Sequence, residues 1–237
     1  MNKKEIVSYE TDASRLIGKA NKVVFVKKVE EISYLIKTNN LDIVPRGAGT
    51  SLVGGCIPNN SLVVDLNKLN NIISLNLKQG IIYVEAGICI KELNSKLSKV
   101  GLEFPINPSN NGVSTIGGMI ATNASDNRSL KYNQIRDWVE EIEIINGRGE
   151  LIKATKADLM DFCGMEGITG IIVRAKLRLI RTPIRTASIF QSDSFEEVLS
   201  IARRLKLEKN ISMLDLFNKE VSVLLGFPEK YHLIIVE

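Results

Sequence analysis

The sequence has 237 residues, 44% of them hydrophobic and 24% charged, which is typical of a soluble globular protein with one large domain or two small ones. The net charge of +4 is mild and the basic residues are scattered, which disfavours a nucleic-acid-binding protein but suits an anionic cofactor or an acidic substrate. The cysteines (Cys56, Cys89 and Cys163) are far apart, which argues against a disulfide framework and a structural zinc site.

The N-terminal residues 1–16 contain no apolar signal core, and no later segment approaches ~20 continuous apolar residues. We therefore predict a cytoplasmic protein. Peripheral attachment to a membrane through a partner is left open.

The first half of the sequence alternates short strands with single helices. Apolar residues at helical spacing predict helices over 29–39 and 90–100, and Gly101 is a typical helix end. Runs rich in Ile, Leu and Val predict the strands, which are 22–26, 41–44, 61–66, 72–77 and 81–86.

In the second half of the sequence we predict further strands, and the pattern of elements changes after Pro183. The capping pattern Ser194-x-x-Glu197 opens a predicted helix over 194–205, and a short helix is expected over 219–225. The predicted strands are 138–145, 149–153, 170–180, 186–191, 211–217 and 232–237. We place a domain boundary near residue 183 because the pattern of elements changes there. One domain is predicted over 1–183, with lobes of about 1–105 and 106–183, and a second, partial domain over 184–237.

The last predicted strand, 232–237, is a continuous apolar run. Such a run is expected to be covered on both faces, and an uncovered one would offer an open edge. We therefore expect self-association through this strand, and a need for further residues from a longer chain or another subunit.

A first glycine-rich run directly follows a predicted strand. Two glycines permit positive φ angles and close approach of a ligand, and successive backbone N–H groups in such a turn favour a phosphate or pyrophosphate. The alternative is an ordinary glycine turn. The candidate residues are Arg46, Gly47, Ala48, Gly49, Thr50, Ser51 and Leu52.

A second run, over 108–125, is rich in small and hydroxyl-bearing residues. Small residues allow a flat ring or a diphosphate to lie against the backbone, and the hydroxyl and amide groups supply hydrogen bonds. The alternative is a close-packed helix of small residues. The candidate residues are Pro108, Ser109, Ser114, Thr115, Gly118, Thr122, Asn123, Ala124 and Ser125.

A third glycine-rich run opens the long strand predicted over 170–180, and its alternative is a simple bend. The candidate residues are Glu166, Gly167, Thr169, Gly170, Ile171 and Ile172. Because the first and third runs lie at separate points of the chain, one extended ligand is expected to bridge them.

Together the three runs resemble the FAD-binding domain of the vanillyl-alcohol-oxidase type flavoproteins, which have the PCMH-type fold. The similarity is to the branch of glycolate oxidase, D-lactate dehydrogenase and alkyl-dihydroxyacetonephosphate synthase. It rests on PRGAGTSLVGG, PSNNGVSTIGGMIATNAS and GMEGITGIIVRAKLRLI, and extends from about residue 22 to the end. The resemblance implies an α+β fold, with a two-lobed FAD-binding domain followed by the start of an α+β cap domain. It also implies that residues 46–52 wrap the pyrophosphate, that residues 109–115 and 122–125 line the diphosphate and isoalloxazine, and that residues 166–172 meet the adenosine end or the ring edge.

The sequence departs from this family at three positions. Ser125 and Asp126 stand where two glycines are common, and Asn133 stands where one glycine is usual. Thr50 occupies the place of the histidine that carries a covalent flavin in some members, and the only histidine is His232. The resemblance therefore implies noncovalent FAD. One ligand that bridges the first and third runs favours FAD over FMN, since a mononucleotide would not need both runs.

The resemblance further implies an FAD-dependent oxidoreductase, or the FAD-binding part of one, that oxidises a 2-hydroxy acid such as D-lactate or glycolate by hydride transfer to flavin and passes electrons to an acceptor. No residue is convincing as the catalytic base, because His232 begins an apolar strand and is expected to be structural. Two alternatives stay open: a non-catalytic FAD-binding electron-transfer subunit of a larger complex, and a scaffold protein that has lost the cofactor.

Overall fold

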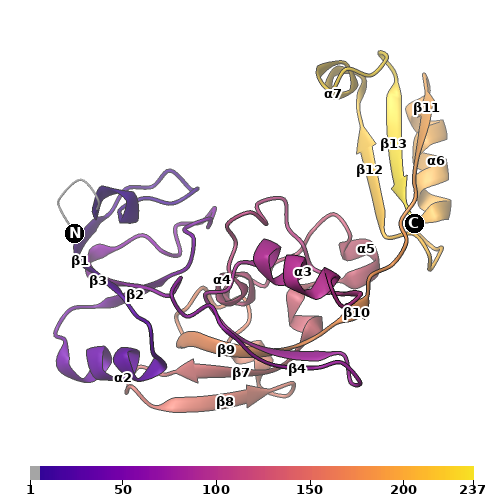
Figure 1. Cartoon of the computed structure of the whole chain (residues 1–237). Helices are drawn as coiled ribbons and strands as arrows, with labels where there is room; N and C mark the ends of the chain where they lie inside the picture. Colours follow the sequence, from indigo (N-terminus) through magenta and orange to yellow (C-terminus); the bar gives the residue numbers. More distant parts are fainter. Residues whose placement is uncertain (1–5) are drawn as a thin grey trace.

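The computed structural model describes residues 6–237. Residues 1–5, which belong to the N-terminal stretch predicted to contain no signal core, lie outside the described residues. The fold is α+β and contains three larger sheets (Figure 1). A small N-terminal sheet lies beside a central sheet, and a C-terminal sheet stands apart from both. Every predicted strand and helix is present, with ends shifted by a few residues.

The N-terminal sheet consists of β1 (Lys19–Phe25), β3 (Asn59–Asp65) and β2 (Ile43–Arg46), in the order β1-β3-β2 with parallel pairing. Helix α2 (Val29–Thr38) buries its apolar face in a core that also contains residues of the central sheet. Parallel pairing brings the end of β2 and the following glycine-rich loop to one edge of the sheet. This placement directs the loop toward the rest of the molecule.

The central sheet is antiparallel and has the order β4-β5-β9-β7-β8. Its strands are β4 (Ile72–Asn76), β5 (Ile81–Glu85), β9 (Ile171–Arg178), β7 (Val139–Ile145) and β8 (Leu151–Thr155). One face packs in a common core with α3 (Ile90–Ser98) and α4 (Ile116–Ala121), and Gly101 ends the first of these helices with φ +69°. Charged side chains of neighbouring strands in this sheet form ion pairs, such as Arg174 of β9 with Glu143 of β7 at 2.8 Å.

The central sheet does not divide at residue 105, where we expected one lobe to end. Strands β4 and β5 precede this position, yet β5 pairs with β9 through five residues from each strand. The chain therefore enters the central sheet near residue 70. The sequence could not show this, because strand pairing across about ninety residues depends on tertiary packing.

Short elements complete this part of the chain. Trp138, expected at the start of a strand, lies instead in a 3₁₀ turn, where its indole Nε1 donates to the Tyr132 carbonyl at 2.6 Å. The other short elements are η1 (Val7–Tyr9), β6 (Leu102–Glu103), α5 (Ser129–Tyr132), η3 (Leu159–Asp161) and β10 (Ile180–Arg181).

The C-terminal unit contains β11 (Ala187–Ser192), α6 (Phe195–Leu205), β12 (Met213–Phe217), α7 (Lys219–Leu224) and β13 (Tyr231–Val236). Ser194 caps α6 as predicted, accepting a hydrogen bond from the Glu197 N–H at 3.3 Å. The sheet order is β11-β13-β12. The terminal strand is therefore the centre of its sheet, paired on both edges, and the expectation of self-association through an open edge of this strand is wrong.

Polar contacts join the C-terminal unit to the rest of the chain. Glu103 binds the guanidinium groups of both Arg185, in the connecting segment, and Arg128. Asn127 Nδ2 donates to Asp215 of β12 at 2.9 Å. The unit boundary near residue 183 remains a prediction. Within residues 6–237, the helices are all too short or too polar to cross a membrane.

Candidate functional site

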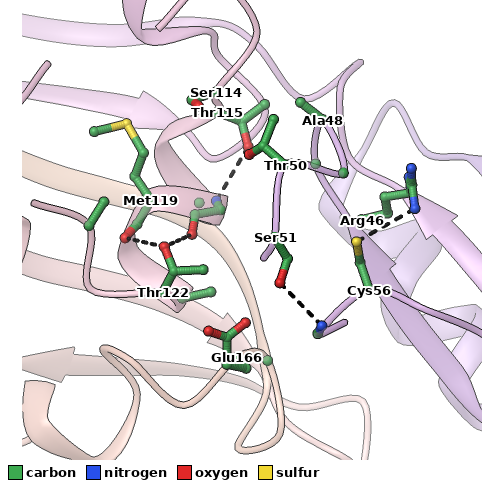
Figure 2. Close-up of a pocket in the computed structure, with 18 of the residues that line it drawn as sticks. Arg46, Ala48, Thr50, Ser51, Cys56, Ser114, Thr115, Met119, Thr122 and Glu166 are labelled. Carbon is green, nitrogen blue, oxygen red and sulfur yellow. Dashed lines mark hydrogen bonds between the residues drawn. The ribbon is translucent and has the colours of Figure 1, made fainter. Parts of the chain in front are cut away.

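A cavity of about 360 Å³ lies where the loop after β2 faces α4 and the start of β9. Figure 2 shows the loop residues Thr50 and Ser51 between Thr115 and Thr122 on one side and Arg46 and Cys56 on the other. The three glycine-rich runs are thus brought together. All the predicted site residues line the cavity except Ser109, Asn123 and Thr169.

The loop over residues 47–52 supplies backbone donors to the cavity. In the part of the chain that the structure describes, none of its N–H groups donates to a protein acceptor. The Ser51 hydroxyl instead accepts from the N–H groups of Val53 and Gly55, both at 3.2 Å, which shapes the end of the loop. Because buried and half-buried N–H groups are nearly always paired, a run of free donors fits an anionic ligand such as a diphosphate.

The second run is a helix of small residues that also opens onto the cavity. Thr115 caps α4 by accepting from the Gly118 N–H at 3.3 Å. Gly117 packs so closely that a Cβ there would lie 2.7 Å from Ala86 Cβ, whereas Gly118 is exposed and lines the cavity. Helix α4 is therefore closely packed on the side of Gly117 and faces the cavity on the side of Gly118.

The C-terminal end of the second run is divided between the cavity and structural roles. Ser125 lines the cavity, as the departure from glycine led us to expect. Asp126 is turned away and accepts from the N–H groups of Asn107 at 2.8 Å and Arg128 at 3.0 Å. Asn123 does not line the cavity, because its side chain is bonded to Gln134 Oε1 at 2.6 Å.

Glu166 of the third run contributes a carboxyl group to the cavity wall. Its backbone has a φ of +53°, and its N–H donates to the Ala121 carbonyl at 2.9 Å. A Cβ on Gly55 would lie 2.4 Å from Glu166 Oε2, so the carboxyl group packs against the far end of the first loop. Burial, and then the nearby Asp12 carboxylate, raise the pKa of Glu166 above its usual value.

Arg46 is among the residues that line the cavity, but its guanidinium points away from it (Figure 2). The Nη2 atom donates to the carbonyls of Ser8 at 3.2 Å and Thr11 at 2.9 Å. The loop therefore presents backbone and hydroxyl groups, rather than a cationic side chain, to the cavity. That residues 46–52 wrap a pyrophosphate remains a prediction.

Several lining residues were absent from the predicted set. Four of them, Asn110, Gly117, Met119 and Ala121, lie within the second run, and Gly55 closely follows the first. These five could have been included on that signal. Others, such as Leu66 and Cys56, have no distinguishing sequence pattern. Burial raises the pKa of the Cys56 thiol to about 11, which keeps it protonated and a poor nucleophile. The additional lining residues are Pro45, Val53, Gly55, Cys56, Leu66, Asn110, Gly117, Met119 and Ala121.

His232 is a structural residue of the C-terminal unit. Its ring is 1% exposed, with Nδ1 at 2.9 Å from Ser222 Oγ and Nε2 at 3.2 Å from Gln191 Oε1. Among the described residues that line the cavity, the titratable side chains are Arg46, Cys56 and Glu166. None of the three is placed as an evident base for a substrate hydroxyl.

The α+β fold, with a cavity lined by backbone N–H groups that have no protein acceptor, has the features of a domain that binds an anionic ligand. The sequence profile of one family, described as an FAD binding domain, matches residues 20–155. This match covers more than half of the chain, and the chain therefore belongs to this family of FAD-binding domains.

Curated relatives and solved structures agree with this assignment. The chain is 27% identical over 219 residues to D-2-hydroxyglutarate dehydrogenase of Stutzerimonas stutzeri, covering 86% of this chain and 47% of the relative. It is 30% identical to the glycolate oxidase subunit GlcD of Bacillus subtilis, covering 68% of this chain and 37% of that subunit. A structure of alkyldihydroxyacetonephosphate synthase has the same fold, with a TM-score of 0.82 at 22% identity over 90% of this chain and 49% of that one. The chain thus spans less than half the length of these proteins.

Proposed function

We propose that this chain is the FAD-binding part of an oxidoreductase that oxidises a 2-hydroxy acid such as D-lactate or glycolate. The family assignment supports the cofactor, and the printed names of its relatives support the substrate class. The observation that carries the proposal is the row of free N–H groups over residues 47–52, opposite the exposed backbone of Gly118 in one cavity.

The residues divide the task of binding in a specific way. The loop N–H groups and the Thr50 hydroxyl hold the diphosphate, and Gly118 leaves room for the ring system. Ser125 and residues 170–172 close the opposite wall. When bound, FAD supplies the acceptor for a hydride, and the protein orients it and limits its contact with water. The absence of a histidine at Thr50, and the protonated Cys56 thiol, support noncovalent binding.

We propose that the base that accepts the proton of the substrate hydroxyl lies outside this chain. Such a base must lie within hydrogen-bond reach of the hydroxyl, and the described cavity wall offers no histidine. We propose that a longer parent chain or a partner subunit supplies it, together with the electron acceptor. We also propose that the protein is cytoplasmic and that it attaches to a membrane only through such a partner.

The absorption spectrum of the purified chain tests the cofactor. Flavin bands that persist through gel filtration and are released on acid denaturation as intact FAD would support noncovalent binding. Recovery of FMN alone would contradict the assignment of FAD. A colourless protein that does not take up added FAD would favour the scaffold alternative.

Substrate turnover tests the proposed activity and the location of the base. The chain is assayed with D-lactate, glycolate and D-2-hydroxyglutarate and an artificial dye as the electron acceptor. We expect FAD binding without appreciable turnover by this chain alone. Turnover would show that the base is present. If FAD binds but no 2-hydroxy acid reduces it, even with the missing residues restored, the alternative of a non-catalytic electron-transfer subunit is favoured. The cavity wall without an evident base is the observation behind that alternative.

A further inference from the structure

Arg46 joins the glycine-rich loop to the N-terminal segment. It is the last residue of β2, directly before the loop, and its side chain is 7% exposed. Besides the two carbonyls of Ser8 and Thr11, its guanidinium lies over the Tyr9 ring at 5.3 Å from the centroid, and Nη1 lies 3.5 Å from Cys56 Sγ. Of these partners, Ser8, Tyr9 and Thr11 do not line the cavity, whereas Cys56 lies in the cavity wall.

The N-terminal segment is itself firmly attached to the N-terminal sheet. The Tyr9 hydroxyl donates to Asp65 Oδ2 at 2.8 Å, at the end of β3. The Glu10 side chain accepts from the Ala20 N–H at 3.0 Å, and its carbonyl accepts from the Gly18 N–H at 2.7 Å. Residues 7–18 therefore form a fixed support to which the Arg46 guanidinium is bonded.

The loop closes directly over this guanidinium. Gly49 has a φ of +73°, and a Cβ on it would lie 2.1 Å from Arg46 Nη2. Glycine is therefore favoured at position 49 for two reasons: the backbone is left-handed, and the Arg46 side chain leaves no room for a Cβ. Removing the guanidinium would leave the loop without its inner contact, and the loop would become free to adopt conformations in which its N–H groups diverge.

We infer that Arg46 and Tyr9 are positioning residues, which hold the loop over residues 47–52 from behind so that its N–H groups converge on the cavity. Arg46 does not neutralise the diphosphate by contact. This inference rests on the proposed placement of the FAD diphosphate at the loop. It predicts that Tyr9, which does not line the cavity, controls FAD affinity.

The test is a double-mutant cycle on the full chain, read as the dissociation constant for FAD from fluorescence quenching. Tyr9→Leu should weaken FAD binding by about tenfold, the effect expected when a hydrogen bond to a charged group and a stacking contact are lost. Arg46→Met should weaken it at least as much. The double variant should be no weaker than Arg46→Met alone, because both changes disable one support.

Two readouts separate positioning from direct contact with the phosphates. The salt dependence of FAD binding in Arg46→Met should equal that of the wild type, because no phosphate contact is lost. Arg46→Lys keeps the charge but loses the two-pronged donor geometry, so it should resemble Arg46→Met. Arg148→Met, at an exposed arginine in the turn after β7, is the matched control and should bind FAD as the wild type does.

A third readout needs no FAD. In the free proteins, elastase should cleave within residues 47–57 faster in Tyr9→Leu and Arg46→Lys than in the wild type and the control, at equal thermal stability by circular dichroism. Wild-type affinity and cleavage in Tyr9→Leu would overturn the inference, as would a flattened salt dependence in Arg46→Met or wild-type affinity in Arg46→Lys. Failure of the wild type to bind FAD would instead refute the proposed function and leave the cleavage test of the loop support in force.

Discussion

Gly47 and Thr115 approach each other so closely that a Cβ on Gly47 would lie 2.4 Å from Thr115 Oγ1. The first residue belongs to the loop after β2, and the second caps α4, so this contact joins two of the glycine-rich runs at the edge of the cavity. A side chain on Gly47 must displace either the loop or the cap.

Gly47→Ala should therefore lower the free energy of unfolding by about 2 kcal/mol, within the range for overpacking. Thr115→Ala, which removes the cap, should lower it by about 1 kcal/mol. The double variant should lose less than the two single effects combined, because the clash atom is absent. Urea unfolding measures all three, and simple additivity would show that the two residues do not contact.

Gly118→Phe should fill the cavity while preserving the fold. Gly118 is exposed and helical, and a Cβ added there would meet only Thr115 Oγ1, at 3.1 Å. A larger residue would therefore project into the space assigned to FAD. We expect FAD affinity to fall by roughly a hundredfold or more, about 3 kcal/mol, in a flavin titration. Gly147→Phe is the matched control, because a side chain there meets nothing within 4 Å and the residue does not line the cavity.

Gly49→Val should disturb the loop itself rather than only block the cavity. The φ of +73° and the Arg46 guanidinium both oppose any side chain at position 49. Equal elastase cleavage of the loop in Gly49→Val and the wild type would contradict that view.

The affinity for FAD should rise as the pH falls through the pKa of Glu166. Burial, followed by the Asp12 carboxylate, raises this pKa in the free protein, and a bound diphosphate nearby would raise it further. Binding is then accompanied by proton uptake, which gives at most about a tenfold change in affinity per pH unit. Glu166→Gln should bind FAD with little pH dependence, whereas Glu150→Gln, at an exposed position, should behave as the wild type. A pH dependence unchanged by Glu166→Gln would contradict this assignment.

Asn133→Gly should stabilise the protein. Asn133 is exposed and has φ +55° and ψ −135°, a conformation that glycine adopts far more easily than other residues. The free energy of unfolding should rise by about 1 kcal/mol. Asn133→Ala should lower it, since alanine tolerates positive φ less well than asparagine. A destabilised Asn133→Gly would indicate that the asparagine side chain has a role beyond its backbone conformation.

The sequence by itself determined the local structure and most of the residues that line the cavity. Helical spacing over 29–39 and the Ser194 capping pattern specified helices, because these signals depend only on neighbours a few residues away. The three glycine-rich runs were identified in the same way, since conformational freedom and small side chains are local properties. The family resemblance then gave the cofactor.

Tertiary structure decided what each of these elements faces. It placed β4 and β5 in the central sheet, put the last strand between two others, and brought Leu66 and Cys56 into the cavity wall. It also turned the Arg46 guanidinium away from the cavity, toward carbonyls of the N-terminal segment more than thirty residues earlier in the chain. These outcomes depend on long-range pairing and on which buried polar groups find partners, and such contacts between distant segments are set only when the whole chain packs.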